Sequence, residues 1–177
     1  MTNSFFTIGH STRSISEFVA LLRSAGVQLV VDVRRMPRSR TNPQFNRDTL
    51  PESLAPEQID YEYIAELGGL RSKRLGDGFS PNTFWENRSF RNYADYALSE
   101  SFRVGLGRLR ELGSKKPAAI MCAEAVWWRC HRRIITDYLI EGGDTVFHIL
   151  GPHKIDAAKL TSAATLVPKL GLVYALE

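Results

Sequence analysis

The chain has 177 residues, of which 44% are hydrophobic and 24% are charged. These proportions are ordinary for a globular domain and exclude disordered and fibrous proteins. The net charge of +4 permits an anionic partner, and 17 of the 23 basic residues are arginine, whose planar fork suits phosphate and carboxylate groups.

The first elements predict a β–α–β unit. Residues 5–9 form a short apolar run that ends at a glycine, as in a strand. Ser14 and Glu17 have the spacing of a capping box, and Gly26 is placed to end the helix that follows. Residues 28–33 are almost continuously apolar, as is typical of a buried parallel strand.

The later segments continue this alternation of strands and helices. The polar stretch over 36–56 is not assigned, and the stretch over 68–88 is predicted to be a long loop. Further strands are expected over 59–64, 117–122 and 144–150, and helices over 89–98, 100–112 and 128–141. The tail from Asp156 favours a helix, followed by a short apolar run over 170–176.

These elements predict a single α/β domain over residues 1–177. Its sheet would have about five strands, mostly parallel, with helices on both faces. Ligands bind such sheets outside the carboxyl ends of the strands. We therefore expect residues 9–11, 32–40 and 122–132 to meet at one edge of the sheet, together with His148.

The segment 122–132 carries the residues best suited to chemistry, which are Cys122, Glu124, Cys130, His131 and Arg132. A cysteine near a helix N-terminus and arginines loses its proton readily, as a nucleophilic or redox cysteine must. His131 can act as acid, base or ligand, and Glu124 as its orienting partner or as a general base. We prefer Cys122 as nucleophile because a strand end is more exposed than a helix turn. In the alternative, both cysteines are buried structural residues.

Two known kinds of cysteine site fit this segment poorly. Cysteine phosphatases have arginine six positions after the cysteine, whereas this chain has Trp128 there and Arg129 one position later, without a glycine-rich loop. The two cysteines are too widely spaced for a structural zinc knuckle, although a mononuclear site assembled from distant segments stays open. No metal ligand is assigned, and no cofactor is indicated.

Two further clusters suit an anionic substrate. Asp32 could serve as base or orienting group beside Arg34, Ser39 and Arg40, or it could form a salt bridge that pins the loop. Gly9 would let the backbone approach a ligand, with His10 as acid, base or ligand and Ser11 beside it. Aromatic and basic residues mix over 79–96, which favours a lid over a surface for single-stranded nucleic acid.

Several of these motifs together resemble the family called Domain of Unknown Function 488, from Phe6 to about Leu150. The motifs occur in the same order and are Thr7-Ile8-Gly9-His10-Ser11, Asp32-Val33-Arg34 with Pro37 and Ser39, Leu67-Gly68-Gly69, and Cys122-Ala123-Glu124 with Cys130-His131-Arg132. The resemblance implies a bacterial or archaeal α/β domain whose cysteines are suspected to be enzymatic. Where many members have proline between the cysteines, this chain has Val126-Trp127-Trp128.

We therefore expect an enzyme acting on a small anionic or phosphate-bearing substrate, such as a nucleotide or a nucleic-acid end. Cys122 or Cys130 would be the nucleophile or a metal ligand in a cysteine-dependent or metal-assisted hydrolase or transferase. His131 or His10 would be the acid or base, and Arg34 and Arg132 the groups that bind the anion. Two alternatives remain: a nucleic-acid-binding module without catalysis, and a redox or metal sensor whose cysteines pair on oxidation. Because the sequence shows no export signal and no membrane-length apolar run, we expect a cytoplasmic protein with reduced cysteines and no membrane partner.

Overall fold

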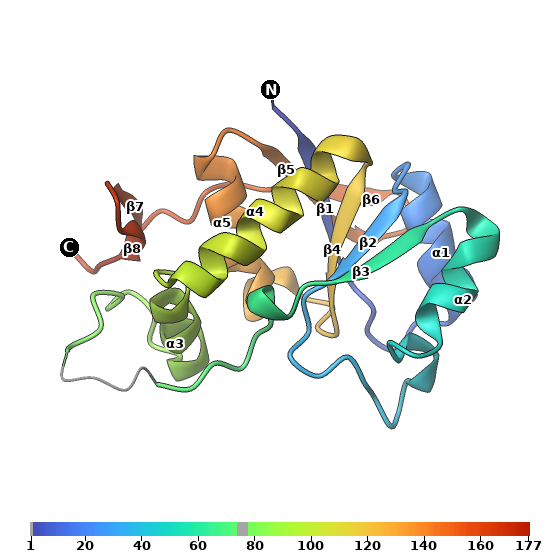
Figure 1. The fold of residues 1–177 in the computed structure, drawn as a ribbon, viewed down its shortest axis with the longest axis horizontal. Helices are drawn as coiled ribbons and strands as arrows, with labels where there is room; N and C mark the ends of the chain where they lie inside the picture. The colour runs from blue at the N-terminus through green and yellow to red at the C-terminus, as the bar shows by residue number, and fades with distance from the viewer. Residues whose placement is uncertain (1, 74–77) are drawn as a thin grey trace.

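Six strands form the main sheet of the computed structural model, which describes residues 2–73 and 78–177. The strands lie in the order β3-β2-β4-β1-β5-β6 (Figure 1). They are β1 (Ser4–Gly9), β2 (Leu29–Asp32), β3 (Asp60–Tyr63), β4 (Ala118–Cys122), β5 (Thr145–Gly151) and β6 (Lys154–Ala157). The first five are parallel, and β6 pairs antiparallel with β5. The predicted α/β class and mostly parallel sheet are confirmed.

Helices cover both faces of this sheet. They are α1 (Ile15–Ser24), α2 (Leu50–Leu54), α3 (Arg88–Tyr96), α4 (Glu100–Lys115) and α5 (Arg132–Glu141). The helices α1 and α2 lie on one side of the sheet, and α4 and α5 on the other (Figure 1). None of the helices in the described parts of the chain is long and apolar enough to cross a membrane.

Alternation along the central strands builds the two cores. In β2, Val30 packs with α1 and α2, whereas Val31 packs with α4 and α5, since successive side chains point to opposite faces. In β4, Met121 belongs to the first core and Cys122 to the second. The Cys122 side chain therefore faces the layer that contains α5.

The predicted N-cap role of Ser14 at the start of α1 is confirmed, whereas the Glu17 carboxylate bonds to the Ser14 hydroxyl and not to its backbone N–H. The Ser14 side chain accepts a hydrogen bond from the backbone N–H of Glu17 at 3.1 Å, and its hydroxyl donates to the Glu17 carboxylate at 3.2 Å. Gly26 has a φ of 72°, in the left-handed region, which ends the helix as predicted.

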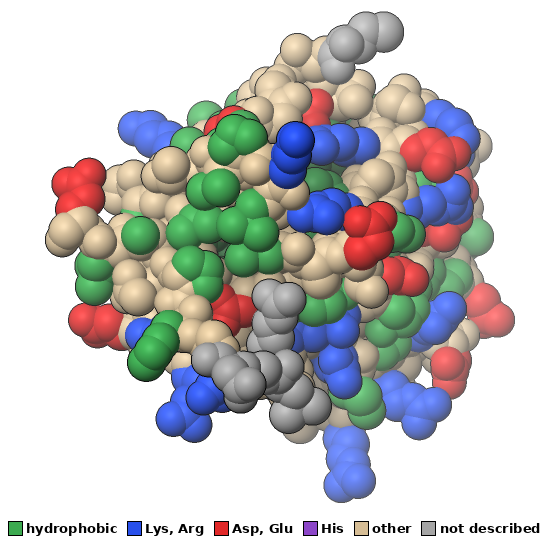
Figure 2. Space-filling model, turned by 60° about the vertical axis from the view of Figure 1, so that its left-hand side comes forward, with side chains coloured by type: hydrophobic (Ala, Val, Ile, Leu, Met, Phe, Trp, Pro, Cys, Tyr) green, Lys and Arg blue, Asp and Glu red, His purple; other side chains and the backbone are tan. Residues whose placement is uncertain are grey.

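The helix predicted for the tail is wrong. Residues after Asp156 complete β6 and then form a hairpin of β7 (Ala164–Val167) and β8 (Gly171–Tyr174). Lys169 and Gly171 have φ values of 66° and 133°, which a helix cannot accommodate, and Tyr174 is buried against the core of α5. Figure 2 brings this end of the molecule forward and shows apolar side chains gathered on it, with Lys and Arg side chains around them.

Two other boundaries differ from the prediction. The polar stretch over 36–56 contains a short 3₁₀ turn (Pro43–Phe45) and α2, whose buried side chains include Leu50 and Leu54. The helix predicted over 128–141 begins only at Arg132, after a 3₁₀ turn (Trp127–Arg129). Cys130 is extended, with φ −126° and ψ 150°, so it precedes the helix.

Candidate active site

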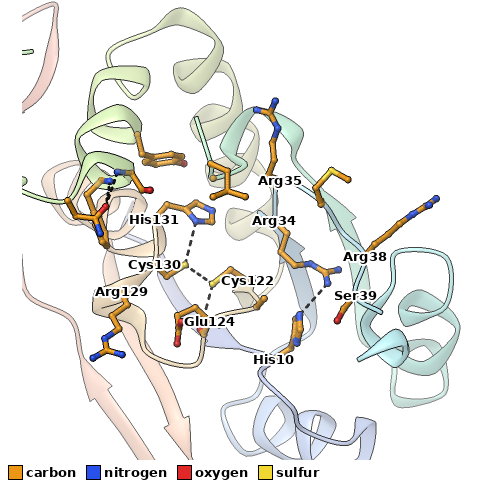
Figure 3. Close-up of a pocket in the computed structure, with 18 residues that line it drawn as sticks. His10, Arg34, Arg35, Arg38, Ser39, Cys122, Glu124, Arg129, Cys130 and His131 are labelled. Carbon is orange, nitrogen blue, oxygen red and sulfur yellow. Dashed lines mark hydrogen bonds between the residues drawn. The ribbon is translucent and has the colours of Figure 1, made fainter. Parts of the chain in front are cut away.

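Three segments meet at the carboxyl edge of the sheet, as the sequence predicts (Figure 3). The backbone N–H of His10 donates to the Cys122 carbonyl at 2.9 Å, which continues the pairing of β1 with β4. The ring of His131 bonds through Nε2 to the carbonyl of Val33, just after β2, at 2.7 Å. These bonds hold the ends of β1, β2 and β4 together with the start of α5.

Gly9 is required by the close approach of two backbones. A Cβ atom at this position would lie 1.9 Å from the carbonyl oxygen of Glu124. The loop after β4 therefore rests directly on the end of β1, and any side chain at position 9 would push it away.

The two cysteines are in direct contact. The Sγ atoms of Cys122 and Cys130 are 2.6 Å apart, and both thiols are free. The Cys122 sulfur also lies 3.7 Å from the Glu124 carbonyl oxygen. The Cys130 sulfur accepts the backbone N–H of Arg132, at the start of α5, at 3.5 Å and lies 3.5 Å from His131 Nδ1.

These contacts shift the pKa values of the two thiols in opposite directions. Burial, then the hydrogen bond and charge of Cys130, raise the pKa of Cys122 well above its usual range. Burial also acts to raise the pKa of Cys130, but the hydrogen bond from Cys122 and the charges of His131 and Arg132 outweigh it. The pKa of Cys130 is lowered well below its usual value while that of Cys122 is raised, which makes Cys130 the more acidic of the two thiols.

The orientation of His131 is fixed on both sides of its ring. Nε2 donates to the Val33 carbonyl, which leaves Nδ1 to exchange a proton with Cys130. On one side, a Cβ atom at Gly69 would lie only 2.7 Å from Nδ1. On another side, the ring centroid of Tyr93 is 5.0 Å away.

Arg132 is a buried cation, with 1% of its surface exposed. Its guanidinium donates to the Glu124 carbonyl and to the Thr7 hydroxyl. Within the described part of the chain it forms no ion pair with a carboxylate. An unpaired buried charge is costly, and the charges of Cys122 and Cys130 are the main effects that raise the pKa of Arg132 against its burial.

Asp32 and Arg34 form the second charged group of the site. The carboxylate of Asp32, which is fully buried, accepts from Arg34 Nε at 2.9 Å and Nη2 at 2.7 Å, and also from the Tyr61 hydroxyl. Arg34 further donates from Nη2 to the Phe45 carbonyl at 2.7 Å. This geometry is the salt bridge that pins the loop, the second of the two interpretations of Asp32.

His10 packs beside this ion pair in a neutral form. Burial is the main cause that lowers the pKa of His10, and the nearby Arg34 acts in the same direction. Its Nδ1 bonds to the Ser11 carbonyl at 2.8 Å, and its Nε2 lies 3.3 Å from Arg34 Nη1, from which it accepts. The ring stacks on Phe45 at 4.4 Å between centroids.

A pocket of about 470 Å³ opens onto the two thiols (Figure 3). Three exposed arginines line it: Arg35, Arg38 and Arg129. None of them forms an ion pair with a carboxylate of the described residues. Glu124 is the acidic lining residue, and Met36 and Leu70 add exposed apolar surface.

The pocket brings together seven of the twelve residues singled out in the sequence. The lining residues are His10, Arg34, Ser39, Cys122, Glu124, Cys130 and His131. The others, Gly9, Ser11, Asp32, Arg40 and Arg132, are not in the lining; Gly9, Asp32 and Arg132 support it from behind through the contacts described above. His148 is buried beneath the site, hydrogen-bonded to Thr7 and stacked on Trp127.

Sequence reasoning missed several residues of this pocket. Leu70 lines it, as do Gly69 and Tyr93, which the sequence places only in the Leu67-Gly68-Gly69 motif and in the aromatic and basic stretch over 79–96. No role is assigned from the sequence to Arg35, Arg38 or Arg129. The described residues contain no group of three or more His, Cys, Asp or Glu side chains placed to hold a metal ion.

Comparison with known proteins gives a family but no activity. A family model described as Domain of unknown function DUF488 matches residues 14–139. No curated protein and no solved structure matches the chain.

Proposed function

This chain belongs to the DUF488 family, and we propose that it is an enzyme in which the Cys130 thiolate attacks a small anionic substrate. The observation that carries the proposal is the position of the Cys130 sulfur. It faces a pocket and is surrounded by hydrogen-bond donors and a buried guanidinium. Such surroundings favour the nucleophilic thiolate form of cysteine.

Charge balance in the interior supports a thiolate at Cys130. A neutral thiol there would leave the guanidinium of Arg132 buried without a compensating charge. A thiolate instead accepts from the Cys122 thiol and from the first N–H of α5, where the helix dipole also favours a negative charge.

The charges around the pocket support an anionic substrate. Arg35, Arg38 and Arg129 have no carboxylate partners among the described residues, so their forks are free to bind carboxylate or phosphate groups. Four N–H groups of Arg34 are already engaged, which leaves one N–H of Nη1 for a ligand. The pocket volume suits a small molecule or one terminal group of a larger one.

Proton transfer in this site would belong to His131. Its Nδ1 lies 3.5 Å from the nucleophilic sulfur, and the Val33 carbonyl holds the ring as a carboxylate does in many catalytic triads. The enzymatic proposal explains the paired thiols at the pocket better than a nucleic-acid-binding module does, since such a module needs arginines and aromatic rings but no thiolate.

Alkylation with two small reagents tests the proposal. Iodoacetate and iodoacetamide carry the same leaving group, but only iodoacetate is an anion. We expect Cys130 to react before Cys122 and to react faster with iodoacetate than with iodoacetamide. It should also stay reactive below pH 8, where an ordinary cysteine with a pKa of about 8.5 is mostly protonated.

Three variants serve as controls for this experiment. Cys130→Ser should lose the fast reaction, and Cys122→Ser should keep a reactive Cys130. Arg38→Ala should reduce the preference for iodoacetate, whereas Arg40→Ala should not, because Arg40 is exposed in the same loop but does not line the pocket. Two cysteines that react equally slowly, with the pH profile of free cysteine, would overturn the proposal.

A further inference from the structure

The second thiol of the site has no role in a simple nucleophilic mechanism. Cys122 is buried, faces the pocket and touches the nucleophilic sulfur at 2.6 Å. A disulfide bond has a length of about 2.05 Å, so the two sulfurs need to move by only about half an ångström to bond. The end of β4 and the extended Cys130 hold them at this separation.

Among the groups near the thiols that could act as a base, the two histidines and Asp32 have partners in the protein, and the Glu124 carboxylate accepts the backbone N–H of Val126 at 3.1 Å. His131 has Nε2 on the Val33 carbonyl and Nδ1 on Cys130, and both ring nitrogens of His10 have partners. Asp32 is fully buried and bonded to Arg34. Hydrolysis of a covalent intermediate needs a base that activates water. Displacement by Cys122 needs no water, because the attacking sulfur already lies 2.6 Å from Cys130, and the Cys122 proton is the only one that has to leave.

We infer that Cys122 and Cys130 form a dithiol pair that reduces a disulfide bond in a small anionic substrate. This inference rests on the proposed function, because it assigns the electrophile that the Cys130 thiolate attacks. The substrate class follows from the pocket, in which cationic arginines and the apolar side chains of Met36 and Leu70 surround the two thiols.

The reaction balances in two exchange steps. In the first, the Cys130 thiolate attacks one sulfur of the substrate RSSR′; a bond forms between Cys130 and the R sulfur, and R′S⁻ leaves with the electron pair of the broken bond. In the second, the Cys122 sulfur attacks Cys130, and the group RS⁻ leaves and takes the Cys122 proton as RSH. The substrate gains two electrons and the cysteines become a disulfide, which an external dithiol must reduce before the next turnover.

The surroundings of the pair favour this order of events. Before the first step, the thiolate at Cys130 accepts the Cys122 hydrogen bond and compensates the charge of Arg132. Once Cys130 is bonded to the substrate, that negative charge is gone. The buried guanidinium of Arg132, whose charge acts to lower the pKa of Cys122, then favours loss of the Cys122 proton.

Exposure of the reduced protein to two disulfides tests the inference. Oxidised glutathione carries carboxylates, whereas cystamine carries two ammonium groups around the same bond. We expect wild-type protein treated with oxidised glutathione to acquire a Cys122–Cys130 disulfide and to retain no glutathionyl group. The reaction should be roughly tenfold faster than with cystamine, the combined effect of three exposed arginines. Intact mass and non-reducing peptide maps measure both products.

Substitution of each cysteine separates the two steps. Cys122→Ser should accumulate a glutathionyl group on Cys130, and Cys130→Ser should react with neither disulfide. Cys122→Ala is a second variant that also removes the thiol, and it suits the strand because β4 already contains buried alanines. Rapid acid quenching of the wild-type reaction should also reveal a transient mixed disulfide on Cys130, which requires no substitution.

The outcomes distinguish this inference from the proposed function. A wild-type adduct as persistent as that of Cys122→Ser would overturn the inference, because Cys122 would not resolve it, yet Cys130 would still be the nucleophile. If iodoacetate modifies Cys130 selectively but oxidised glutathione does not react, the inference is likewise overturned and the proposed function is kept. Equal rates with glutathione disulfide and cystamine would refute the anionic substrate class. A Cys130 that reacts no faster than free cysteine with iodoacetate would remove the proposed function itself.

Discussion

The ion pair of Asp32 and Arg34 offers a quantitative test of how the site is held. Both side chains are buried, with exposures of 0% and 5%. Asp32→Asn keeps the shape of the side chain but removes the charge that compensates the guanidinium. Breaking a buried pair by removing one partner costs about 3–5 kcal/mol. With an m-value of about 2 kcal/mol/M in urea, the unfolding midpoint should fall by about 1.5–2.5 M.

A double-mutant cycle makes this prediction specific. Arg34→Met leaves Asp32 as the uncompensated charge and should also destabilise the protein. The double variant Asp32→Asn/Arg34→Met removes both charges. Its free energy of unfolding should fall by much less than the sum of the decreases in the two single variants. Urea unfolding followed by circular dichroism measures all four proteins at pH 7.

The same variants separate an anchoring role of Asp32 from a role in proton transfer. If Asp32 only anchors the loop, folded Asp32→Asn protein should keep most of the iodoacetate reactivity of Cys130. The reasoning is refuted if Asp32→Asn leaves the unfolding midpoint unchanged while the reactivity of Cys130 collapses, since Asp32 would then act on the reacting groups.

Three further predictions address other parts of the site. Burial, with a smaller effect of the nearby arginine, lowers the pKa of His148 to about 4, so the unfolded chain, with a histidine pKa of about 6.5, binds the proton more readily. Stability is therefore lost as the pH falls from 6.5 towards 4. Between pH 7 and pH 4, the free energy of unfolding of the wild type should drop by about 3 kcal/mol more than that of His148→Gln. Equal drops for the two proteins in urea titrations would contradict this prediction. Gly69→Ala should push His131 away from Cys130, because the added Cβ would lie 2.7 Å from Nδ1 of His131. Alkylation of Cys130 should then require a higher pH. An unchanged pH profile would show that His131 does not assist the thiolate. Arg38→Ala should weaken inhibition of alkylation by inorganic phosphate about two- to fivefold, as expected for one exposed charge, and unchanged inhibition would place the anion elsewhere in the pocket.

The sequence by itself determined the order of the main elements and the edge at which the site lies. The apolar run before Asp32 and the run that ends at Cys122 are short and rich in residues that favour strands, which predicts buried strands, and parallel strands place their carboxyl ends together. The capping residues around Ser14 marked the first helix for an equally local reason. For the same reason, His10, Arg34 and the two cysteines could be expected to meet before any coordinates were seen.

Only the tertiary structure decided how the charges and protons are distributed within the site. The contact of Cys122 with Cys130 is made within one loop, but that loop is held by bonds to distant strands, from His131 to the Val33 carbonyl and from Arg132 to the Thr7 hydroxyl. The preference for Cys122 rested on the exposure expected of a strand end, whereas both cysteines are buried and the hydrogen bonds favour the thiolate at Cys130.

The tail shows why some local structure cannot be predicted from local pattern. Residues from Asp156 have a composition that a helix tolerates, but β5 offers an unpaired edge and the core beside α5 accepts Tyr174. Backbone hydrogen bonds to β5 and burial of that aromatic ring favour strands and a hairpin over an exposed helix. Propensity acts within a few residues, whereas the core that buries Tyr174 is built by helices and strands far away in the sequence, so here the tertiary structure decided the outcome.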